Sequence, residues 1–433
     1  MLGGGTFLTQ NKVLNGTYIN FVSAARASAT LSDRGVVALP IALNWGKEGE
    51  VFTVTQEDFQ KNSMKILGYD YSASELMAFR EIFLNAVKVH VYNLNSGGVK
   101  ATGSLATAKY AGTRGNDIKY VVTTNVDDES KYDVVLYVGS TKVDSQTVAT
   151  SAELVDNDYV VYNKEAQISL TAGTPLTGGT NGSELSGESY QKALDKLESY
   201  NFNALVCPSK ESSIIALFVA YTKRLRDQVG VKFQTVVYQN LADYEGVISV
   251  ENAVDGDDEI GIVYWTAGVS AGCAVNRSNT NKKYDGELVV LCPHTQSELE
   301  AGVLAGKFMF HKVEDEVRVL TDINTFVSVT PEKNEDFSSN QVIRVIDQCA
   351  NDTASIFNTK YLGKVQNDKS GRVSFWSDIV AHRKQLQTIR AIEDYNPDLL
   401  IVEQGDSKKS VAVSETIKPT VAMEQLYMTI VIE

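Results

Sequence analysis

The chain has 433 residues, which is too long for one ordinary core and enough for roughly two to four domains. Hydrophobic residues make up 43% of the chain and charged residues 22%, a composition that is typical of soluble globular proteins and excludes a disordered chain. The formal net charge of −14 argues against general nucleic-acid binding, because that binding depends on Lys and Arg side chains that neutralise phosphates.

The longest apolar runs are too short to span a membrane. They are residues 213–221 and 426–432, and each falls well below the ~18–20 apolar residues that a bilayer requires. The first residues of the chain lack both the basic start and the apolar stretch of a secretory signal. We therefore expect no direct membrane insertion, and synthesis in the cytoplasm.

The N-terminal part predicts an extended arm followed by alternating strands and helices. Residues 1 to about 16 are rich in Gly, Thr and Asn with isolated hydrophobes, which favours an extended arm over a packed element. Further on, Leu76 and Ile82 belong to a run at helical spacing, with Ser72 and Ser74 as candidate caps. The expected elements are strands at 18–23, 35–43 and 87–92 and helices at 57–67 and 74–85.

The composition then shifts toward β structure. From residue 96 to about 171 the chain is dominated by β-branched and aromatic residues in short alternating runs, which turn signals separate at short intervals. The clearest runs are 119–124, 132–138 and 158–162. This pattern predicts a small antiparallel β domain that is inserted into another domain.

An α/β pattern follows the glycine-rich turn at 178–182. The expected elements are helices at 189–200 and 211–228 and strands at 204–207, 233–238 and 260–264. Helices that alternate with apolar strands indicate a sheet covered on both faces. Because residues 57–92 show the same alternation, we predict one discontinuous α/β core domain with the β domain inserted between its two parts.

The last third of the chain predicts an α+β domain. The expected elements are amphipathic helices at 340–358 and 375–395 and strands at 399–403, 410–416 and 421–432. The second helix is expected to end before Pro397. The final strand alternates cleanly, with Leu426, Met428, Ile430 and Ile432 on one face and Tyr427, Thr429 and Val431 on the other.

A long apolar strand at the end of a chain is an aggregation liability unless it has a partner. Two interpretations of residues 421–432 stay open. The segment is either an edge strand that completes its own C-terminal sheet, or a strand that is added to the sheet of a neighbouring subunit through main-chain hydrogen bonds.

Three segments superficially resemble ligand loops, and each lacks a required feature. In residues 302–307 the two glycines are separated by three residues, whereas a phosphate loop needs four, and Phe308 stands where the motif has the Ser or Thr that holds Mg²⁺. A helix with closely packed small residues is therefore favoured for this segment. Residues 178–182 lack a following Lys and favour a domain-boundary turn. Residues 255–259 lack the ligand spacing of a calcium loop and favour a solvated turn.

Cysteine and histidine residues give no stronger candidate. The four cysteines are widely spaced and form no CxxC pair, so we interpret them as buried free thiols. Cys207 and Cys292 each precede a proline at the end of a predicted strand, where a thiol nucleophile is conceivable but a buried thiol is favoured. The four histidines form no metal-binding motif. We expect no catalytic, cofactor or metal site, and therefore no enzyme.

Four segments, taken in order, resemble a known family. They are Leu176-Thr-Gly-Gly-Thr-Asn-Gly182, Ala267-Gly-Val-Ser-Ala-Gly-Cys-Ala-Val-Asn276, Val317-Arg-Val-Leu-Thr-Asp-Ile-Asn-Thr-Phe326 and Lys418-Pro-Thr-Val-Ala-Met-Glu-Gln-Leu-Tyr-Met428. Together they are similar to contractile tail sheath proteins, in the branch found in phages and R-type, phage-tail-like bacteriocins of Gram-positive bacteria. The resemblance extends over nearly the whole chain.

The resemblance implies a structural subunit that polymerises helically, as stacked rings around a tail tube, and contracts to drive the tube through a target cell envelope. The implied partners are further copies of the chain, the tail tube protein, and the baseplate and tail terminator proteins, without nucleic acid. The subunit would be synthesised in the host cytoplasm, assembled into the tail particle and released by lysis. Without a phosphate loop, the energy would come from subunit contacts that differ between two packings.

The resemblance also assigns parts of the chain to roles. Residues 1–22 and 421–433 become arms that add strands to the C-terminal sheet of a neighbour. The arm residues that carry this prediction are Phe7, Leu8, Tyr18, Ile19, Leu426, Tyr427, Met428, Ile430 and Ile432. The remaining domains are the core parts at 23–95 and 173–334, the outer inserted β domain at 96–172 and the tube-proximal domain at 335–420.

The tube contact rests on charge alone. Arg383, Lys384 and Arg390 on the second C-terminal helix are candidates, because sheath and tube surfaces are often matched by charge, but an ordinary solvated helix face explains them equally well. The alternative function is another phage tail or surface-layer assembly protein that does not contract.

Overall fold

The computed structural model describes residues 31–182, 184–256 and 258–432, and these fall into two compact units. We call the described residues among 33–348 and 419–433 the α/β unit, and those among 1–32 and 349–418 the C-terminal unit. The predicted N-terminal arm, with Phe7, Leu8, Tyr18 and Ile19, and the predicted strand at 18–23 lie outside the described residues. No helix in the described ranges is long and apolar enough to cross a membrane.

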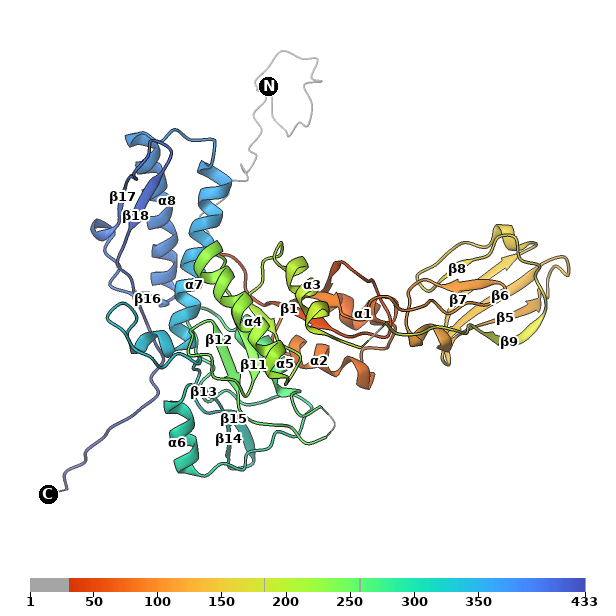
Figure 1. The fold of residues 1–433 in the computed structure, drawn as a ribbon, viewed down its shortest axis with the longest axis horizontal. Helices are drawn as coiled ribbons and strands as arrows, with labels where there is room; N and C mark the ends of the chain where they lie inside the picture. The colour runs from red at the N-terminus through yellow and green to blue at the C-terminus, as the bar shows by residue number, and fades with distance from the viewer. Residues whose placement is uncertain (1–30, 183, 257, 433) are drawn as a thin grey trace, which may run out of the picture. The chain divides into compact units, whose positions relative to one another are not determined.

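A seven-stranded sheet forms the centre of the α/β unit, in the order β13-β12-β11-β10-β1-β3-β2. Figure 1 labels its strands β1, β11, β12 and β13. Its strands are β1 (Val36–Ile41), β2 (Val51–Thr55), β3 (Lys88–Asn93), β10 (Ala204–Val206), β11 (Gln234–Tyr238), β12 (Val247–Val250) and β13 (Lys307–Phe308). Neighbouring strands run parallel except β2, which is antiparallel to β3. The central strands β1 and β10 therefore come from the two sequence segments that the inserted domain separates.

Helices cover both faces of this sheet, as the sequence predicts. They are α1 (Gln56–Leu67), α2 (Met77–Phe83) and α5 (Ile262–Gly272) on one face and α3 (Gly187–Leu197) and α4 (Ser212–Arg224) on the other. In β1, Val37 and Leu39 pack in the core beneath α1, α2 and α5, while Ala38 packs beneath α3 and α4. Successive side chains of a strand point to opposite faces, so a strand covered on both sides is apolar throughout.

Two elements of the α/β unit differ from the prediction. The predicted strand at 260–264 is wrong, because Ile262 begins α5. Every residue from Ile262 to Ala271 is buried, so this helix has no polar face and its apolar run lacks the helical period that distinguishes a helix from a strand. Strand β12 was not predicted. The predicted Ser72 or Ser74 cap is also absent: Ala73 precedes the short 3-10 turn η1 (Ser74–Leu76), which leads into α2 without a side-chain cap.

The inserted segment forms the predicted antiparallel β domain. Its strands are β4 (Ala106–Ala108), β5 (Ile118–Thr124), β6 (Tyr132–Val138), β7 (Thr141–Val148), β8 (Val160–Tyr162) and β9 (Thr171–Pro175). They form a four-stranded sheet in the order β7-β6-β5-β9 and a separate β4–β8 pair. Ile118, Tyr120 and Val122 alternate into the core of this domain. Strand β9 pairs with β5 as far as Pro175, three residues beyond the predicted boundary at residue 172.

Further elements of the α/β unit flank β13 in the chain. They are α6 (Gln296–Leu304), the hairpin β14 (Phe310–Val313) and β15 (Glu316–Val319), and the first part of α7 (Asn340–Ile356). The boundary between the two units falls within α7. Helix α7 thus confirms the predicted helix at 340–358, and a π-helical turn over Phe357–Tyr361 extends it.

The C-terminal unit contains α8 and a hairpin of two strands. Its elements are α8 (Lys369–Thr388), β16 (Ile392–Glu393), β17 (Ile401–Gln404), β18 (Val411–Ser414) and the start of β19 (Lys418–Pro419). Helix α8 begins earlier than the predicted residue 375, because the Asp368 carboxylate accepts a hydrogen bond from the Gly371 backbone N–H at 2.8 Å. It also ends earlier than predicted, before Arg390, whose φ of 60° lies in the left-handed region.

No strand is assigned to residues 420–432. The prediction that residues 421–432 form a strand is therefore wrong for this chain by itself. A strand needs a hydrogen-bonded neighbour, and none of the sheets formed by the described residues includes this segment. The interpretation of the segment as an edge strand of its own C-terminal sheet is wrong for the same reason.

Candidate assembly surfaces

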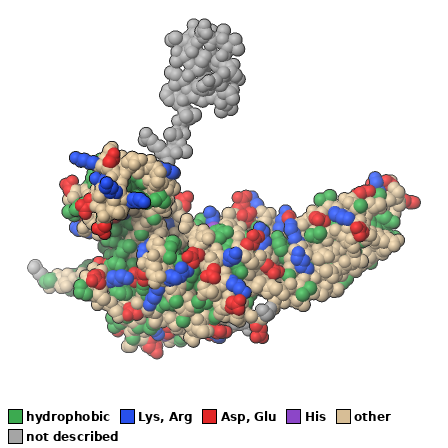
Figure 2. Space-filling model, turned by 45° about the horizontal axis from the view of Figure 1, so that its top comes forward, with side chains coloured by type: hydrophobic (Ala, Val, Ile, Leu, Met, Phe, Trp, Pro, Cys, Tyr) green, Lys and Arg blue, Asp and Glu red, His purple; other side chains and the backbone are tan. Residues whose placement is uncertain are grey.

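The C-terminal segment exposes a row of large apolar side chains. Leu426, Tyr427, Met428, Ile430 and Ile432 are between 71% and 92% exposed. Soluble proteins bury such side chains unless a partner covers them. The rest of the described chain does not cover the apolar side chains of this segment. In contrast, Figure 2 shows acidic and basic side chains interspersed over the visible face of the molecule.

Among the described residues, β17 and β18 form a sheet of two strands. The register pairs Ile401 with Ser414 and Gln404 with Val411, and no other strand among the described residues pairs with either outer edge. Helix α8 packs against β17, but the side chains of Ile401 and Val413 remain 53% and 40% exposed. An isolated two-stranded sheet is marginally stable and offers unpaired N–H and C=O groups to another strand. The hairpin is therefore a candidate acceptor for added strands.

The three candidate tube contacts lie in different environments. Arg383 does not lie on the exposed helix face where the sequence analysis placed it, because its side chain is only 2% exposed. Its guanidinium binds the Glu415 carboxylate through Nε, with 3.1 Å to each oxygen, and donates to Thr353 Oγ1 at 3.0 Å. This group stabilises the C-terminal unit internally. Lys384 and Arg390 are exposed, but Arg390 lies beyond the end of α8.

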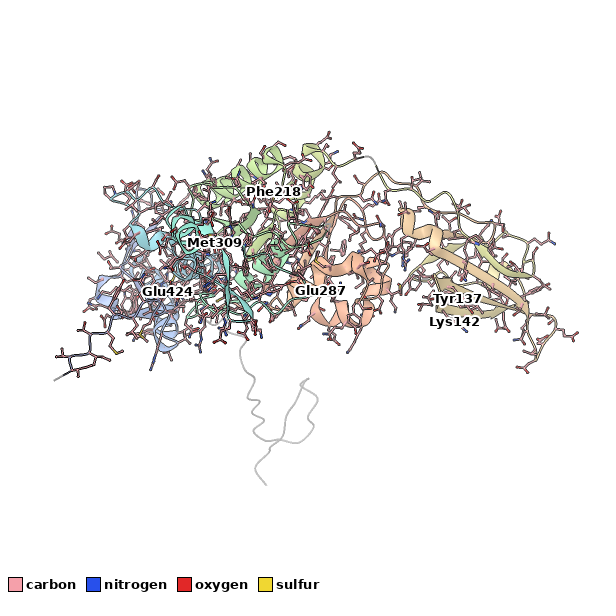
Figure 3. All side chains as sticks on the ribbon, turned by 90° about the horizontal axis from the view of Figure 1, so that it is seen from below. Tyr137, Lys142, Phe218, Glu287, Met309 and Glu424 are labelled. Carbon is pink, nitrogen blue, oxygen red and sulfur yellow. The ribbon has the colours of Figure 1, made fainter. Side chains whose placement is uncertain are left out.

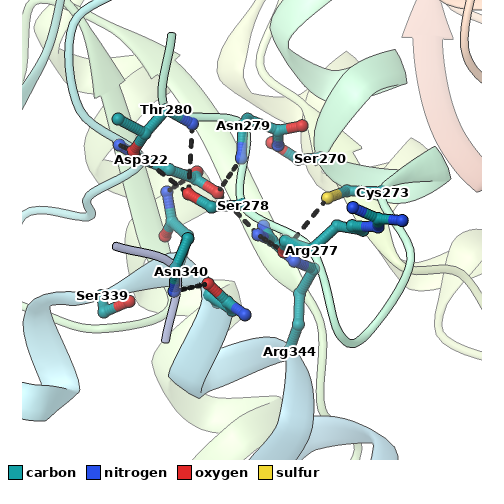
Figure 4. A network of polar contacts seen from close by, with 12 residues as sticks. Ser270, Cys273, Arg277, Ser278, Asn279, Thr280, Asp322, Ser339, Asn340 and Arg344 are labelled. Carbon is teal, nitrogen blue, oxygen red and sulfur yellow. Dashed lines mark hydrogen bonds and ion pairs between the residues drawn. The ribbon is translucent and has the colours of Figure 1, made fainter. Parts of the chain in front are cut away.

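A buried ion pair organises the turn at residues 277–280 (Figure 4). Asp322 and Arg344 are 2% and 1% exposed, and Arg344 Nη2 donates to Asp322 Oδ2 at 2.6 Å. Arg344 Nη2 also donates to the Arg277 carbonyl oxygen at 2.9 Å, and the Asn279 backbone N–H donates to Asp322 Oδ2 at 2.8 Å. The pair therefore fixes the turn against α7.

Asn340, at the start of α7, completes the network. Its Nδ2 donates to Asp322 Oδ1 at 3.0 Å, and its Oδ1 accepts from Gln234 Nε2 of β11 at 2.8 Å. The sequence analysis missed these residues as a group. The only signal was that Asp322 and the residues just before the turn lie within segments of the family resemblance, which says nothing of their contacts.

Four family models match consecutive parts of the chain. They describe the tail sheath protein Gp18 domain III N-terminal region (residues 34–94), the phage tail sheath protein beta-sandwich domain (96–181), the phage tail sheath protein central domain (183–325) and the phage tail sheath C-terminal domain (332–433). The chain is also 35% identical to a sheath tail protein from Desulfitobacterium hafniense whose structure is solved, over 94% of this chain and 98% of that one, with a TM-score of 0.81. The chain belongs to the phage tail sheath protein family.

Other comparisons agree with this assignment. The sheath protein is 31% identical to the phage-like element PBSX protein XkdK of Bacillus subtilis (strain 168), over 99% of both chains. Its fold is similar to the anti-feeding prophage helical sheath in its contracted state, with a TM-score of 0.53 over 98% of this chain and 99% of that one, at 11% identity. The predicted resemblance and the predicted fold class, with an inserted β domain and an α+β C-terminal part, are thus confirmed.

The segments that resemble ligand loops have structural roles in this sheath protein. Gly302 and Gly306 lie at the C-terminal end of α6, whereas a phosphate loop precedes the N-terminus of a helix. A Cβ at Gly302 would collide with Met309 Sδ, which supports the predicted close packing. Thr180 pairs with Val99 in an antiparallel bridge, so residues 178–182 form the expected domain-boundary turn. In the segment 255–259, Glu259 pairs with Lys210 at 3.2 Å, and Asp257 lies outside the described residues.

The thiols of the sheath protein fit the structural interpretation better than a catalytic one. All four cysteines are free; Cys207, Cys273 and Cys349 are buried, as predicted, and Cys292 is half-buried. Burial raises the pKa of the Cys207 thiol to about 12, which keeps it protonated and a poor nucleophile at neutral pH. Among residues 31–182, 184–256 and 258–432, no group of three or more His, Cys, Asp or Glu side chains could hold a metal ion.

Proposed function

We propose that this sheath protein polymerises helically, in stacked rings around a tail tube, and that the assembly contracts to drive the tube through a target cell envelope. One observation carries the proposal: among the described residues, the same chain has an exposed apolar run at 426–432 that joins no sheet and a β17–β18 hairpin whose outer edges pair with no other strand. When the segment of one copy pairs with the hairpin of the next, the contact is head-to-tail. Such contacts generate helical arrays when the rotation does not close.

The linking arms in this proposal are residues 421–433 and the N-terminal residues 1–22. Main-chain hydrogen bonds hold an added strand whatever the domains around it do, so links of this kind persist while rigid units reorient. The alternation along the C-terminal arm supports this role, because a pleated strand would place Leu426, Met428, Ile430 and Ile432 on one face.

In this proposal the free energy for contraction comes from a change in the packing of the subunits. The fold likeness to a sheath in its contracted state supports it, and so does the absence of a phosphate loop at residues 302–307. Two packings that differ by a few kcal/mol per subunit are enough, since many subunits convert together. The protein acts as a structural subunit and catalyses no reaction.

The proposed partners are other copies, the tail tube protein, and the baseplate and tail terminator proteins. We place the residues around 335–420 next to the tube, with Lys384 and Arg390 as contacts, and the inserted domain at 96–172 outside. The subunit is made in the host cytoplasm, joins the tail particle there and leaves by lysis.

Negative-stain electron microscopy tests the proposed assembly. The purified chain, alone or with tube protein, is expected to form regular hollow tubes, whereas a chain without residues 421–433 stays dispersed. A matched pair of variants separates apolar pairing from chain length. Met428→Ser with Ile430→Ser is expected to abolish tubes, and the conservative Thr429→Ser is expected to preserve them. Tubes from the truncated chain, or only monomers from the intact chain with tube protein, contradict the proposal.

A further inference from the structure

The C-terminal segment begins with a set of polar contacts to the α/β unit. The Ala422 backbone N–H donates to Gln341 Oε1 of α7 at 3.0 Å. Thr280 Oγ1 donates to Glu424 Oε1 at 2.7 Å, and Ser278 Oγ lies 3.5 Å from the same oxygen. Figure 3 labels Glu424, the residue that accepts these contacts from the 277–280 turn. The root of the segment is therefore held in place although its apolar end is exposed.

The surface that receives the root is rigid. Thr280 Oγ1 accepts a hydrogen bond from the Asp322 backbone N–H at 2.9 Å, and Gln341 is only 3% exposed. Both residues adjoin the buried Asp322–Arg344 pair, which fixes the 277–280 turn and the start of α7. The contacts to Ala422 and Glu424 thus come from atoms whose positions the fold already determines.

These contacts connect the segment to a particular unit. The residues immediately before it in the chain, up to Lys418, belong to the C-terminal unit, whereas residues 278, 280, 341 and 419–433 belong to the α/β unit. A force applied to the exposed end of the segment therefore meets residues of the α/β unit first, before it reaches the chain of the C-terminal unit.

We propose that Ser278, Thr280 and Gln341 form a docking site for the root of the C-terminal arm, so that a neighbouring subunit that holds the arm pulls directly on the α/β unit. The inference rests on the proposed function, because it takes residues 421–433 as a linking arm. It assigns Glu424 as a positioning residue, which sets where the arm leaves the subunit and makes no contact with the neighbour.

Hydrogen exchange of the unassembled protein tests the docking site itself. In peptides that cover residues 419–425 the Ala422 amide is expected to be protected, because it donates to Gln341, while peptides that cover 426–432 exchange freely. Glu424→Ala is expected to speed this exchange about fivefold, the factor for one ordinary hydrogen bond. Glu424→Gln retains an oxygen acceptor and is expected to stay near the unmodified chain. Glu129→Ala removes an exposed carboxylate of the inserted domain and serves as the control.

Tube assembly of the same variants tests the role of the site. Glu424→Ala is expected to raise the protein concentration needed for tubes about fivefold, with Glu129→Ala unchanged. An unprotected Ala422 amide in the unmodified chain overturns the docking site. Normal assembly of Glu424→Ala overturns its role in carrying force, while the proposed function stands if the chain without residues 421–433 remains dispersed. Tubes from that truncated chain overturn the proposed function and leave the exchange result intact.

Discussion

Glu81 is a carboxyl group that is buried in α2 beneath the loop at 284–287. It is 1% exposed and accepts hydrogen bonds from Tyr284 Oη and the Glu287 backbone N–H, each at 2.9 Å. Burial raises its pKa above the ordinary value, and the two hydrogen bonds only partly oppose this effect. The folded chain therefore binds this proton more tightly than the unfolded chain, so Glu81 makes the free energy of unfolding fall as pH rises through its folded pKa.

Replacing Glu81 with Gln removes this pH-dependent penalty. We expect Glu81→Gln to gain stability relative to the unmodified chain at about pH 7.5, and the gain to shrink as pH falls toward about 4.5. Urea unfolding across this pH range measures the difference. Glu75→Gln, at an exposed position in the 3-10 turn that precedes the same helix, is the control and should show no such trend. A gain of equal size at every pH contradicts the assignment of the raised pKa to Glu81.

The Asp322–Arg344 pair predicts a large cost for losing one partner. Arg344→Met leaves the Asp322 carboxylate buried without its ion pair, and this is expected to destabilise the chain by about 3–5 kcal/mol. Arg224 forms a comparable pair with Glu198 at 2.6 Å, but these side chains are 41% and 37% exposed. Arg224→Met is therefore expected to cost at most about 1 kcal/mol. Urea midpoints of the two variants measure the contrast, and equal costs would show that the buried pair does not stabilise the fold.

Helix α5 shows how close packing overrides a sequence pattern. It lies so close to α2 and the residues just after it that a Cβ at Gly268 would collide with the Ile82 carbonyl oxygen, and a Cβ at Gly272 with that of Asn85. Because α5 is buried on all sides, its sequence is a continuous run of apolar and small residues. It therefore has no polar face, and a helix prediction from sequence depends on such a face. By contrast, the predicted helix at 57–67 agrees closely with α1, which in the structure opens with a capping box of Thr55 and Asp58.

This packing predicts the effect of a single methyl group. Gly272→Ala is expected to destabilise the chain by about 1–3 kcal/mol, because the obstacle is backbone and cannot rotate away. Gly187→Ala in the first turn of α3 meets open space and is expected to be neutral or slightly stabilising. Thermal or urea unfolding compares the two variants. A tolerated Gly272→Ala would contradict the close approach of α5 and α2.

In the C-terminal segment, unlike in α5, the sequence pattern is clear but does not by itself decide the structure. Its alternation of apolar residues was visible in the sequence, and the side chains are exposed as an unpaired strand requires. No sheet of the described residues includes this segment, and in the proposed assembly its strand partner belongs to a neighbouring copy, which no pattern within the segment encodes. The strands β17 and β18 were predicted from their own residues, but only the structure shows that no other strand among the described residues pairs with their outer edges.

For the whole molecule, the fold class and the family followed from the sequence, because composition changes abruptly at the inserted domain and the family segments keep their order. The contacts that organise the assembly surfaces did not. Arg383 was taken as a surface charge since it lies on a helix with other cations, yet Glu415 and Thr353 surround it. Glu424 was not singled out at all, because its partners Ser278 and Thr280 lie far from it in the sequence.

The central claim is that the C-terminal arm of one copy pairs with the β17–β18 hairpin of another. A helical cryo-electron microscopy reconstruction of assembled tubes tests it most directly. We predict that residues 421–432 form a strand hydrogen-bonded to an outer edge of that hairpin in a neighbouring subunit, with Leu426, Met428, Ile430 and Ile432 on one face. Tubes in which this segment packs on its own chain, or in which both hairpin edges stay unpaired, would contradict the account.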